Sequence, residues 1–330
     1  ETAGVTLLRG PARILSPTEV EVDGQTHRAN KLLIATGATP QSNNIPLGIT
    51  LMVITTFVFA VQDGLSRHLA SEYNVMMVVM IRYWFFAAFV IALAKRHAGG
   101  LRAAARTSQP VLQIFRGLLL AAEICVMIVA FTILGLVESH AVFTCYPLLV
   151  AALSGPVLGE SVGWRRWAAI GVGFIGVLII LQPGMSVFDP AAVIPLVAAA
   201  MFAVYGLLTR YVGRKDKTAT SFFWTGVTGS VAMTATGLWY WEPMIASDWL
   251  IMGCLCITGV TGHWLLIRCY EVAEASAVQP FAYLQLVFAA IIGISAFGET
   301  VRPNVAIGAA LIVAAGLFTF WRERQKGRAR

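Results

Sequence analysis

The sequence predicts an all-α integral membrane protein with ten transmembrane helices, arranged as two five-helix repeats of inverted topology. The first observation is composition: the 330 residues are 58% hydrophobic and only 12% charged, whereas a soluble domain carries about 25% charged residues. The second is a series of apolar runs of about 20 residues, the length that crosses a hydrocarbon core about 30 Å thick. The third is that motifs of the first half return in the second half in the same order.

Short polar loops separate the ten apolar runs, and each run predicts one membrane helix. The predicted helices cover residues 46–66, 74–94, 111–136, 139–158, 165–182, 189–210, 219–240, 248–268, 275–297 and 303–321.

The repeated motifs keep a nearly constant spacing along the chain. They are FAVQDGLSR (59–67) with FAVYGLLTR (202–210), YW (83–84) with FW (223–224), and GESV (159–162) with GETV (298–301). Because each half has an odd number of helices, the second half must enter the membrane the other way up. Such repeats build a mid-membrane site with two alternating openings, as in secondary transporters.

The positive charges lie in alternate loops. If the N-terminus is cytoplasmic, the cytoplasmic loops and tail hold Lys95, Arg96, Arg102, Arg106, Arg165, Arg166, Arg210, Arg214, Lys215, Lys217, Arg268 and five basic residues within 322–330. The opposite loops hold Arg67 and Arg302. This asymmetry predicts that both termini are cytoplasmic. It also accounts for the net charge of +7 without a nucleic-acid partner.

Cofactor and metal chemistry is not predicted. All five cysteines lie in or at the ends of apolar runs, in a pattern of neither a disulfide framework nor a zinc site. A G-x-G-x-x-G match at 171–176 lies inside an apolar helix with no strand before it, so it does not predict dinucleotide binding. Without a Walker motif, ATP drive is not expected. We therefore expect a transporter and not an enzyme, with no metal or nucleotide cofactor.

Residues 1–41 differ in kind from the rest. The segment 18–24 alternates like a strand that ends in a turn, and 31–40 (KLLIATGATP) predicts a buried strand followed by a glycine turn. This leader resembles a fragment of the flavoprotein disulfide reductases, which raises a membrane-anchored flavin reductase as an alternative of a different class. The expected division is a dispensable leader (1–41), two repeats (42–183 and 184–321) and a basic cytoplasmic tail (322–330).

The body resembles the drug/metabolite transporter superfamily, with two EamA-type repeats. The resemblance is carried by the Gly159-Glu160 and Gly298-Glu299 turns, each followed by a helix rich in small residues, together with Arg82 and Pro147. It implies a carrier of the bacterial inner membrane, most similar to amino-acid exporters of the YddG type. Export of amino acids, hydrophobic and aromatic ones included, by alternating access is the expected function. Uptake or exchange of S-adenosylmethionine, riboflavin or a related metabolite is the alternative.

Ionisable and polar residues inside the predicted helices are the first candidates for substrate binding. Glu123 and His263 occupy nearly equivalent places in the two repeats, and a charge at mid-membrane is costly unless it serves a function. Gln62 and Asp63 of the first repeat correspond to Tyr205 and Gly206 of the second, an asymmetry suited to a polar ligand. The alternatives are a neutral or paired structural Glu123, a satisfied interface His263, and an Asp63 paired with Arg67 four residues along its helix.

Aromatic residues complete the predicted site. Trp84 and Trp224 correspond across the repeat and could line an amphipathic cavity, or else belong to an interfacial belt. Tyr146 and Tyr283 follow or adjoin prolines, where a helix irregularity can open a cavity or be a packing kink. The two Gly-Glu turns are expected to be structural, with the glycine ending one helix and the glutamate near the start of the next. The small-residue stretches at 168–176 and 306–316 predict close helix packing, so the fifth and tenth helices are expected to be scaffold.

Overall fold

The computed structural model describes residues 12–16, 19–22, 25–28, 44–96, 100–158, 164–181, 190–213, 215–273 and 278–328. The chain divides into two compact units, Glu1–Pro40 and Gln41–Arg330.

The N-terminal unit contains a small antiparallel sheet in the order β1-β2-β3. Its strands are β1 (Ala12–Ser16), β2 (Glu19–Val22) and β3 (Gln25–Arg28). The strand predicted within 18–24 is confirmed as β2, which pairs Val22 with Ala12 of β1. The second predicted strand, at 31–40, lies outside the described residues.

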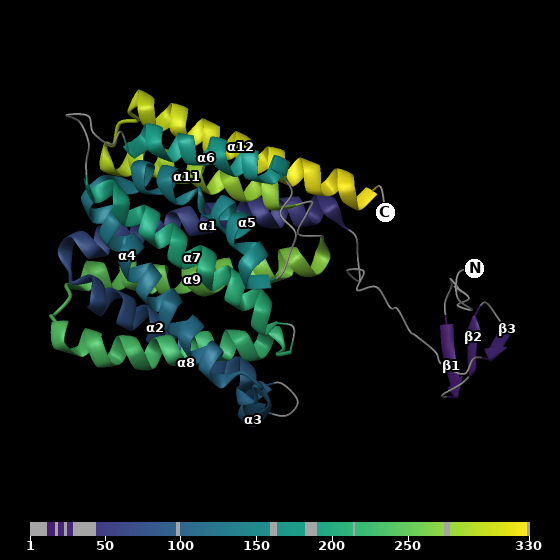
Figure 1. The fold of residues 1–330 in the computed structure, drawn as a ribbon. Helices are drawn as coiled ribbons and strands as arrows, with labels where there is room; N and C mark the ends of the chain where they lie inside the picture. The colour runs from purple at the N-terminus through teal and green to yellow at the C-terminus, as the bar shows by residue number, and fades with distance from the viewer. Residues whose placement is uncertain are drawn as a thin grey trace. The chain divides into compact units, whose positions relative to one another are not determined.

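The second unit is a bundle of helices (Figure 1). Its elements are α1 (Ile45–Glu72), α2 (Val75–Arg96), α3 (Gly100–Ala105), α4 (Pro110–Phe143), α5 (Tyr146–Leu158), α6 (Trp164–Leu181), η1 (Pro190–Ala192), α7 (Val193–Val212), α8 (Thr218–Gly237), η2 (Leu238–Tyr240), α9 (Ala246–Val272), η3 (Gln279–Tyr283), α11 (Leu284–Phe297) and α12 (Pro303–Arg328).

Composition explains why these helices form a membrane bundle. Within the described residues, α1, α2, α4 and the segments Pro190–Thr209 and Ala246–Leu266 are long and apolar enough to span a bilayer. Three shorter apolar helices, Trp167–Leu181, Phe281–Phe297 and Pro303–Phe318, accompany them. The segment predicted at 219–240 is helical too, as α8 and η2, although serine, threonine and glycine make it less apolar. The unit is thus an all-α membrane bundle.

The predicted boundary between helices three and four is present as a break at Gly135 and not as a loop. α4 runs on to Phe143 across a break at Gly135, whose φ of 84° and ψ of 175° are not helical. Its 34 residues would make a straight helix of about 50 Å, longer than the membrane core, so the break divides it. Glycine tolerates a positive φ at little steric cost. The predicted fourth helix, 139–158, is interrupted again at Thr144 and Cys145 before α5 begins.

The packing partners of the two halves correspond. α1 packs against α9 and α11, and its repeat counterpart α7 packs against α4 and α5. α2 packs against its own counterpart α8, and α6 against its counterpart α12. In Figure 1, α2 and α8 lie at one side of the bundle while α6 and α12 lie at the opposite side. An approximate two-fold relation between the repeats explains these paired contacts.

Close packing of α6 on α12 depends on glycine. A Cβ at Gly176 would lie 2.7 Å from the backbone oxygen of Gly308, and a Cβ at Gly308 would lie 2.5 Å from that of Gly176. The prediction that the small-residue stretches of these helices pack closely is confirmed. Another turn residue behaves as predicted: Gly298 ends α11 in the left-handed conformation, with φ 65°.

Candidate functional site

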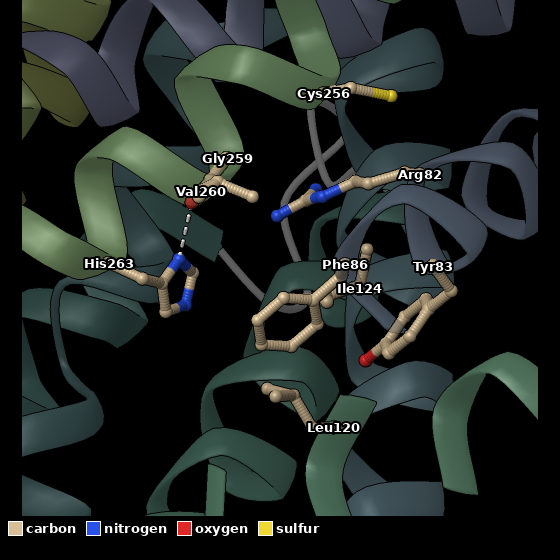
Figure 2. Close-up of a pocket in the computed structure, with 9 residues that line it drawn as sticks. All are labelled: Arg82, Tyr83, Phe86, Leu120, Ile124, Cys256, Gly259, Val260 and His263. Atoms are coloured by element: carbon tan, nitrogen blue, oxygen red, sulfur yellow. Dashed lines mark hydrogen bonds between the residues drawn. The ribbon is translucent and has the colours of Figure 1, made fainter. Parts of the chain in front are cut away.

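A small cavity lies between α2, α4 and α9, near the middle of these helices. Figure 2 shows the nine side chains and backbone segments that line it: Arg82, Tyr83, Phe86, Leu120, Ile124, Cys256, Gly259, Val260 and His263. We call this the central cavity. Its free volume is about 30 Å³, room for roughly two water molecules.

Helical spacing places the lining residues of α2. Arg82 and Phe86 are four residues apart and so lie on one face of the helix. Figure 2 shows the guanidinium of Arg82 extending into the space framed by Phe86, Gly259 and His263. A Cβ at Gly259 would lie 3.6 Å from Arg82 Nε, an ordinary contact, and 3.3 Å from Gln62 Oε1, a tighter one. Within the described part of the chain, Arg82 forms no ion pair and no hydrogen bond.

Two carboxylates lie on the α1 and α4 side of Arg82. Glu123 is 5% exposed, and its charge interacts with those of Asp63 and Arg82. Among the described residues Glu123 has no hydrogen-bond partner. Asp63 Oδ2 lies 3.1 Å from His140 Nε2 and accepts a hydrogen bond of 3.1 Å from Gln285 Nε2. The alternative that Asp63 pairs with Arg67 is therefore wrong.

Aromatic rings surround His263. The ring centroids of Phe59, Phe86 and Phe222 lie 5.3, 6.0 and 6.4 Å from that of the imidazole. The imidazole Nδ1 lies 2.8 Å from the backbone oxygen of Gly259, which fixes the ring in the wall of the cavity. The cavity thus joins a free cation and nearby carboxylates to an aromatic wall.

A polar clasp lies at the end of the bundle where α1 ends and α2 begins. Arg67 and Glu299 form an ion pair, and the guanidinium also stacks over the Phe297 ring at 4.1 Å. The Glu299 carboxylate accepts hydrogen bonds of 2.8 Å from the backbone N–H groups of Leu136 and Val137, which follow the break at Gly135. These orphan amides would otherwise lack an acceptor. We call Arg67, Glu299 and the two amides the α1–α11 clasp.

The clasp refines the prediction for the Gly-Glu turns. Glu299 was expected beside the start of the following helix, but it caps the second part of α4, which is far away in sequence. A side chain at Gly135 would clash with this carboxylate. A second ion pair, between Arg302 and Glu138, lies beside the clasp. The first turn, Gly159-Glu160, lies outside the described residues.

A second polar network lies at the opposite end, where α4 and α8 begin. Arg116 is 1% exposed and donates to the side chains of Gln113, Tyr205 and Thr225 at 3.0, 3.1 and 2.8 Å. Its guanidinium also lies 5.2 Å from the centre of the Tyr205 ring. Further bonds reach Thr209 and the backbone oxygen of Ser221. This Arg116 network ties α4 to α7 and α8.

Asp216 extends this network in the loop before α8. Its carboxylate accepts hydrogen bonds from Thr107, from Ser108 and, at 2.9 Å, from Gln113 Nε2. Burial acts to raise the pKa of Asp216, but these hydrogen bonds to the charged form outweigh it, so the pKa is lowered from its ordinary value. The loop is therefore held by a charged acceptor.

The structure separates the nine predicted site residues. His263 lines the central cavity, and Gln62, Asp63 and Glu123 lie near it. Trp84 instead is 38% exposed, donates to Thr234 at 2.7 Å and stacks on Trp241 at 6.2 Å, which favours the interfacial alternative.

The other aromatic candidates lie away from the cavity lining. Trp224 donates its indole N–H to the backbone oxygen of Ala105 at 3.1 Å, which joins α8 to α3. Tyr205 belongs to the Arg116 network. Tyr146 begins α5 directly after the break and packs against Phe202 at 4.9 Å. Tyr283 ends η3 beside Gly316, where a Cβ would clash with its hydroxyl.

Two arginines have site roles that sequence reasoning missed. Arg82 was used only as part of the family resemblance, and Arg116 was not considered. A signal was present, because each is a lone arginine inside an apolar run, and ionisable residues in such runs face a cavity or a partner.

Comparison with known proteins identifies the family. The EamA-like transporter family matches residues 46–182 and again residues 190–321. The chain is 25% identical to the S-adenosylmethionine uptake transporter of Rickettsia prowazekii, over 84% of this chain and 94% of that protein. It is 26% identical to the riboflavin transporter of Vibrio cholerae over 86% and 96%, and 30% identical to that of Brucella anthropi over 73% and 87%.

A solved crystal structure shares the fold. It has a TM-score of 0.55 and 20% identity, and the match covers 81% of this chain and 95% of that one. The two family matches fall on the two halves that carry the repeated motifs. This chain is a multi-pass membrane transporter and belongs to the EamA-like transporter family of the drug/metabolite transporter superfamily.

Proposed function

We propose that this protein carries S-adenosylmethionine across the bacterial inner membrane by alternating access, in uptake or exchange. The observation that carries the proposal is the central cavity, which combines the guanidinium of Arg82 with aromatic rings and has the carboxyl groups of Glu123 and Asp63 nearby. S-Adenosylmethionine has a carboxylate, cationic groups and an aromatic base. Relatives named as transporters of this solute match nearly their full length.

The central cavity is too small to hold the proposed solute, which supports a transport cycle in which the helices separate to admit it. Pockets for ligands of this size measure about 300–1,000 Å³, far more than the roughly 30 Å³ found here. The α1–α11 clasp and the Arg116 network hold the helices together on the two sides of the cavity. Loading therefore requires one network to open while the other stays closed, which is the requirement of alternating access.

The membrane arrangement forms part of the same proposal. We place ten crossings with both termini in the cytoplasm, because the loops carrying the excess of Lys and Arg then all face one side. The two repeats are 42–183 and 184–321, with 1–41 as a dispensable leader and 322–330 as the tail. The leader's flavin-reductase alternative is not carried further, since the family is one of transporters.

Amino-acid export, the function favoured by the sequence, receives no support from the names of the relatives described. Riboflavin is the second candidate, because riboflavin transporters match the chain over a similar length. Riboflavin is aromatic but offers neither a carboxylate nor an ammonium group to the charged side of the cavity.

The test is counterflow with purified full-length protein in liposomes loaded with unlabelled S-adenosylmethionine. We expect labelled S-adenosylmethionine to accumulate transiently inside, and unlabelled S-adenosylmethionine in the external medium to abolish the uptake. Protein-free liposomes are the blank, and the exposed Glu72→Gln variant should behave like the parent. Counterflow of riboflavin without counterflow of S-adenosylmethionine would overturn the proposal, as would flux of neither solute.

A further inference from the structure

The charges around the central cavity are separated by sign. Arg82 contributes a guanidinium on α2, while Glu123 on α4 and Asp63 on α1 contribute carboxyl groups within electrostatic range of it. No ion pair joins Arg82 to either of them among the described residues. A charge in the membrane interior is costly unless it faces a cavity or a partner. A guanidinium and carboxyl groups held apart in this way are thus suited to a ligand that carries complementary groups at its two ends.

The guanidinium has the right donors for a carboxylate. Arginine presents N–H groups in a planar fork that binds both oxygens of a carboxylate at once. Figure 2 shows this fork aimed into the cavity, toward the side where Phe86, Val260 and His263 lie. The phenyl ring and the aliphatic side chain offer no hydrogen-bond acceptor. The imidazole Nδ1 donates to the backbone oxygen of Gly259, which leaves Nε2 as the acceptor of this ring.

The carboxyl side is suited to an ammonium. Glu123 is 5% exposed and without a hydrogen-bond partner in the described part of the chain. Gln62 Oε1 adds a buried acceptor without a hydrogen-bond partner, and it lies near Gly259 at the cavity wall. An ammonium has three donors and no acceptor, so carboxyl and amide oxygens are partners of the kind it requires.

From this separation we infer that the central cavity recognises the α-amino-acid headgroup of its solute, with the carboxylate on Arg82 and the ammonium on Glu123 and Gln62. The inference rests on the proposed function and deepens it, because it names the part of S-adenosylmethionine that is recognised. The aromatic rings of Phe59, Phe86 and Phe222 then form the wall for the remainder of the solute. Solutes without the headgroup, riboflavin among them, are poorly bound.

The test compares four unlabelled competitors in the counterflow of labelled S-adenosylmethionine. These are S-adenosylmethionine, S-adenosylhomocysteine, decarboxylated S-adenosylmethionine and methylthioadenosine. We expect S-adenosylhomocysteine, which keeps the headgroup, to compete within about threefold of S-adenosylmethionine. The two compounds without a carboxylate should compete at least about tenfold less well, because a buried donor set is then left unpaired.

Variants show whether Arg82 carries the discrimination. In Arg82→Gln the preference for S-adenosylmethionine over its decarboxylated form should vanish, a change that a general loss of stability would not produce. Arg82→Lys should retain part of the preference, since it keeps the charge and loses the fork. Arg102→Gln, which removes an exposed arginine of α3, is the matched control and should keep the preference of the parent.

The outcomes separate this inference from the proposed function. If S-adenosylmethionine is transported but all four competitors act equally, the inference is wrong and the function stands. If S-adenosylmethionine is not transported, binding of phenylalanine and of phenethylamine to the detergent-solubilised parent decides the question. Preference for phenylalanine would then support headgroup recognition, and absence of that preference would overturn it. Because the competitor series uses the parent protein, it holds even if Arg82→Gln fails to fold.

Discussion

At the scale of single residues, the charged side chains inside the bundle differ in whether they have hydrogen-bond partners. Arg116 and Arg82 are both arginines in apolar helices, yet both terminal nitrogens of Arg116 donate hydrogen bonds, while Arg82 extends into a cavity. Asp63 is engaged by His140 and Gln285, whereas Glu123 has no such partner among the described residues. This contrast points to Arg82 and Glu123 as the pair to alter first.

Replacing Glu123 by glutamine tests the carboxylate at constant shape. We expect Glu123→Gln to reach the membrane and to lose at least tenfold in solute flux, about 1.4 kcal/mol in the rate-limiting barrier. The reason is that the amide cannot neutralise an ammonium or carry a proton. Initial rates of counterflow, normalised to folded protein by size-exclusion chromatography, measure the effect.

The exposed Glu72→Gln variant serves as the control for this change, because Glu72 ends α1 at the surface. Parental transport by Glu123→Gln across the pH range would assign Glu123 a purely structural role.

At the scale of elements, α4 shows how one turn can organise a distant helix. The break at Gly135 exposes two amides, and the turn between α11 and α12 supplies the carboxylate that accepts from both. Arg67 of α1 then balances the charge of Glu299. Three helices from both repeats therefore depend on one side chain, although a sequence motif places Glu299 only in its local turn.

A double-mutant cycle tests the α1–α11 clasp. We expect Arg67→Gln and Glu299→Gln each to lower the thermal unfolding midpoint in detergent, with the larger loss for Glu299→Gln. That variant removes the ion pair and also weakens the cap on α4. The double variant should be more stable than the sum of the two losses predicts, with a coupling of about 0.5–3 kcal/mol. Additive losses would show that the ion pair contributes nothing beyond the cap.

At the scale of the whole molecule, corresponding contacts in the two halves imply a common architecture. α1 with α9 and α7 with α4 are equivalent pairs, and the self-equivalent pairs α2–α8 and α6–α12 stand on opposite sides of the bundle. The central cavity does not follow this symmetry. α2, α4 and α9 line it, but within the described part of the chain α8, the counterpart of α2, does not. A symmetric scaffold thus carries an asymmetric site, which a chemically asymmetric solute requires.

Reporter fusions test the proposed topology. A fusion directly after Arg330 should be active with a cytoplasmic reporter and inactive with alkaline phosphatase, because the tail residues 322–330 carry five Lys or Arg. A fusion in the loop at 242–245, between the seventh and eighth predicted helices, should give the opposite result. Phosphatase activity at Arg330 would contradict an even number of crossings from a cytoplasmic N-terminus.

The sequence by itself determined the class of this protein, because bilayer crossing depends on composition and length, which are local properties. Its repeated motifs and its Gly-Glu turns also established the family. The tertiary structure decided which charges meet. It joined Glu299 to the amides after Gly135 and gave Asp63 the partners His140 and Gln285. Among the residues that the structure describes, it left Arg82 without a hydrogen-bond partner beside His263. Such contacts join residues far apart in the chain, and they depend on helix rotation and packing that no local pattern specifies.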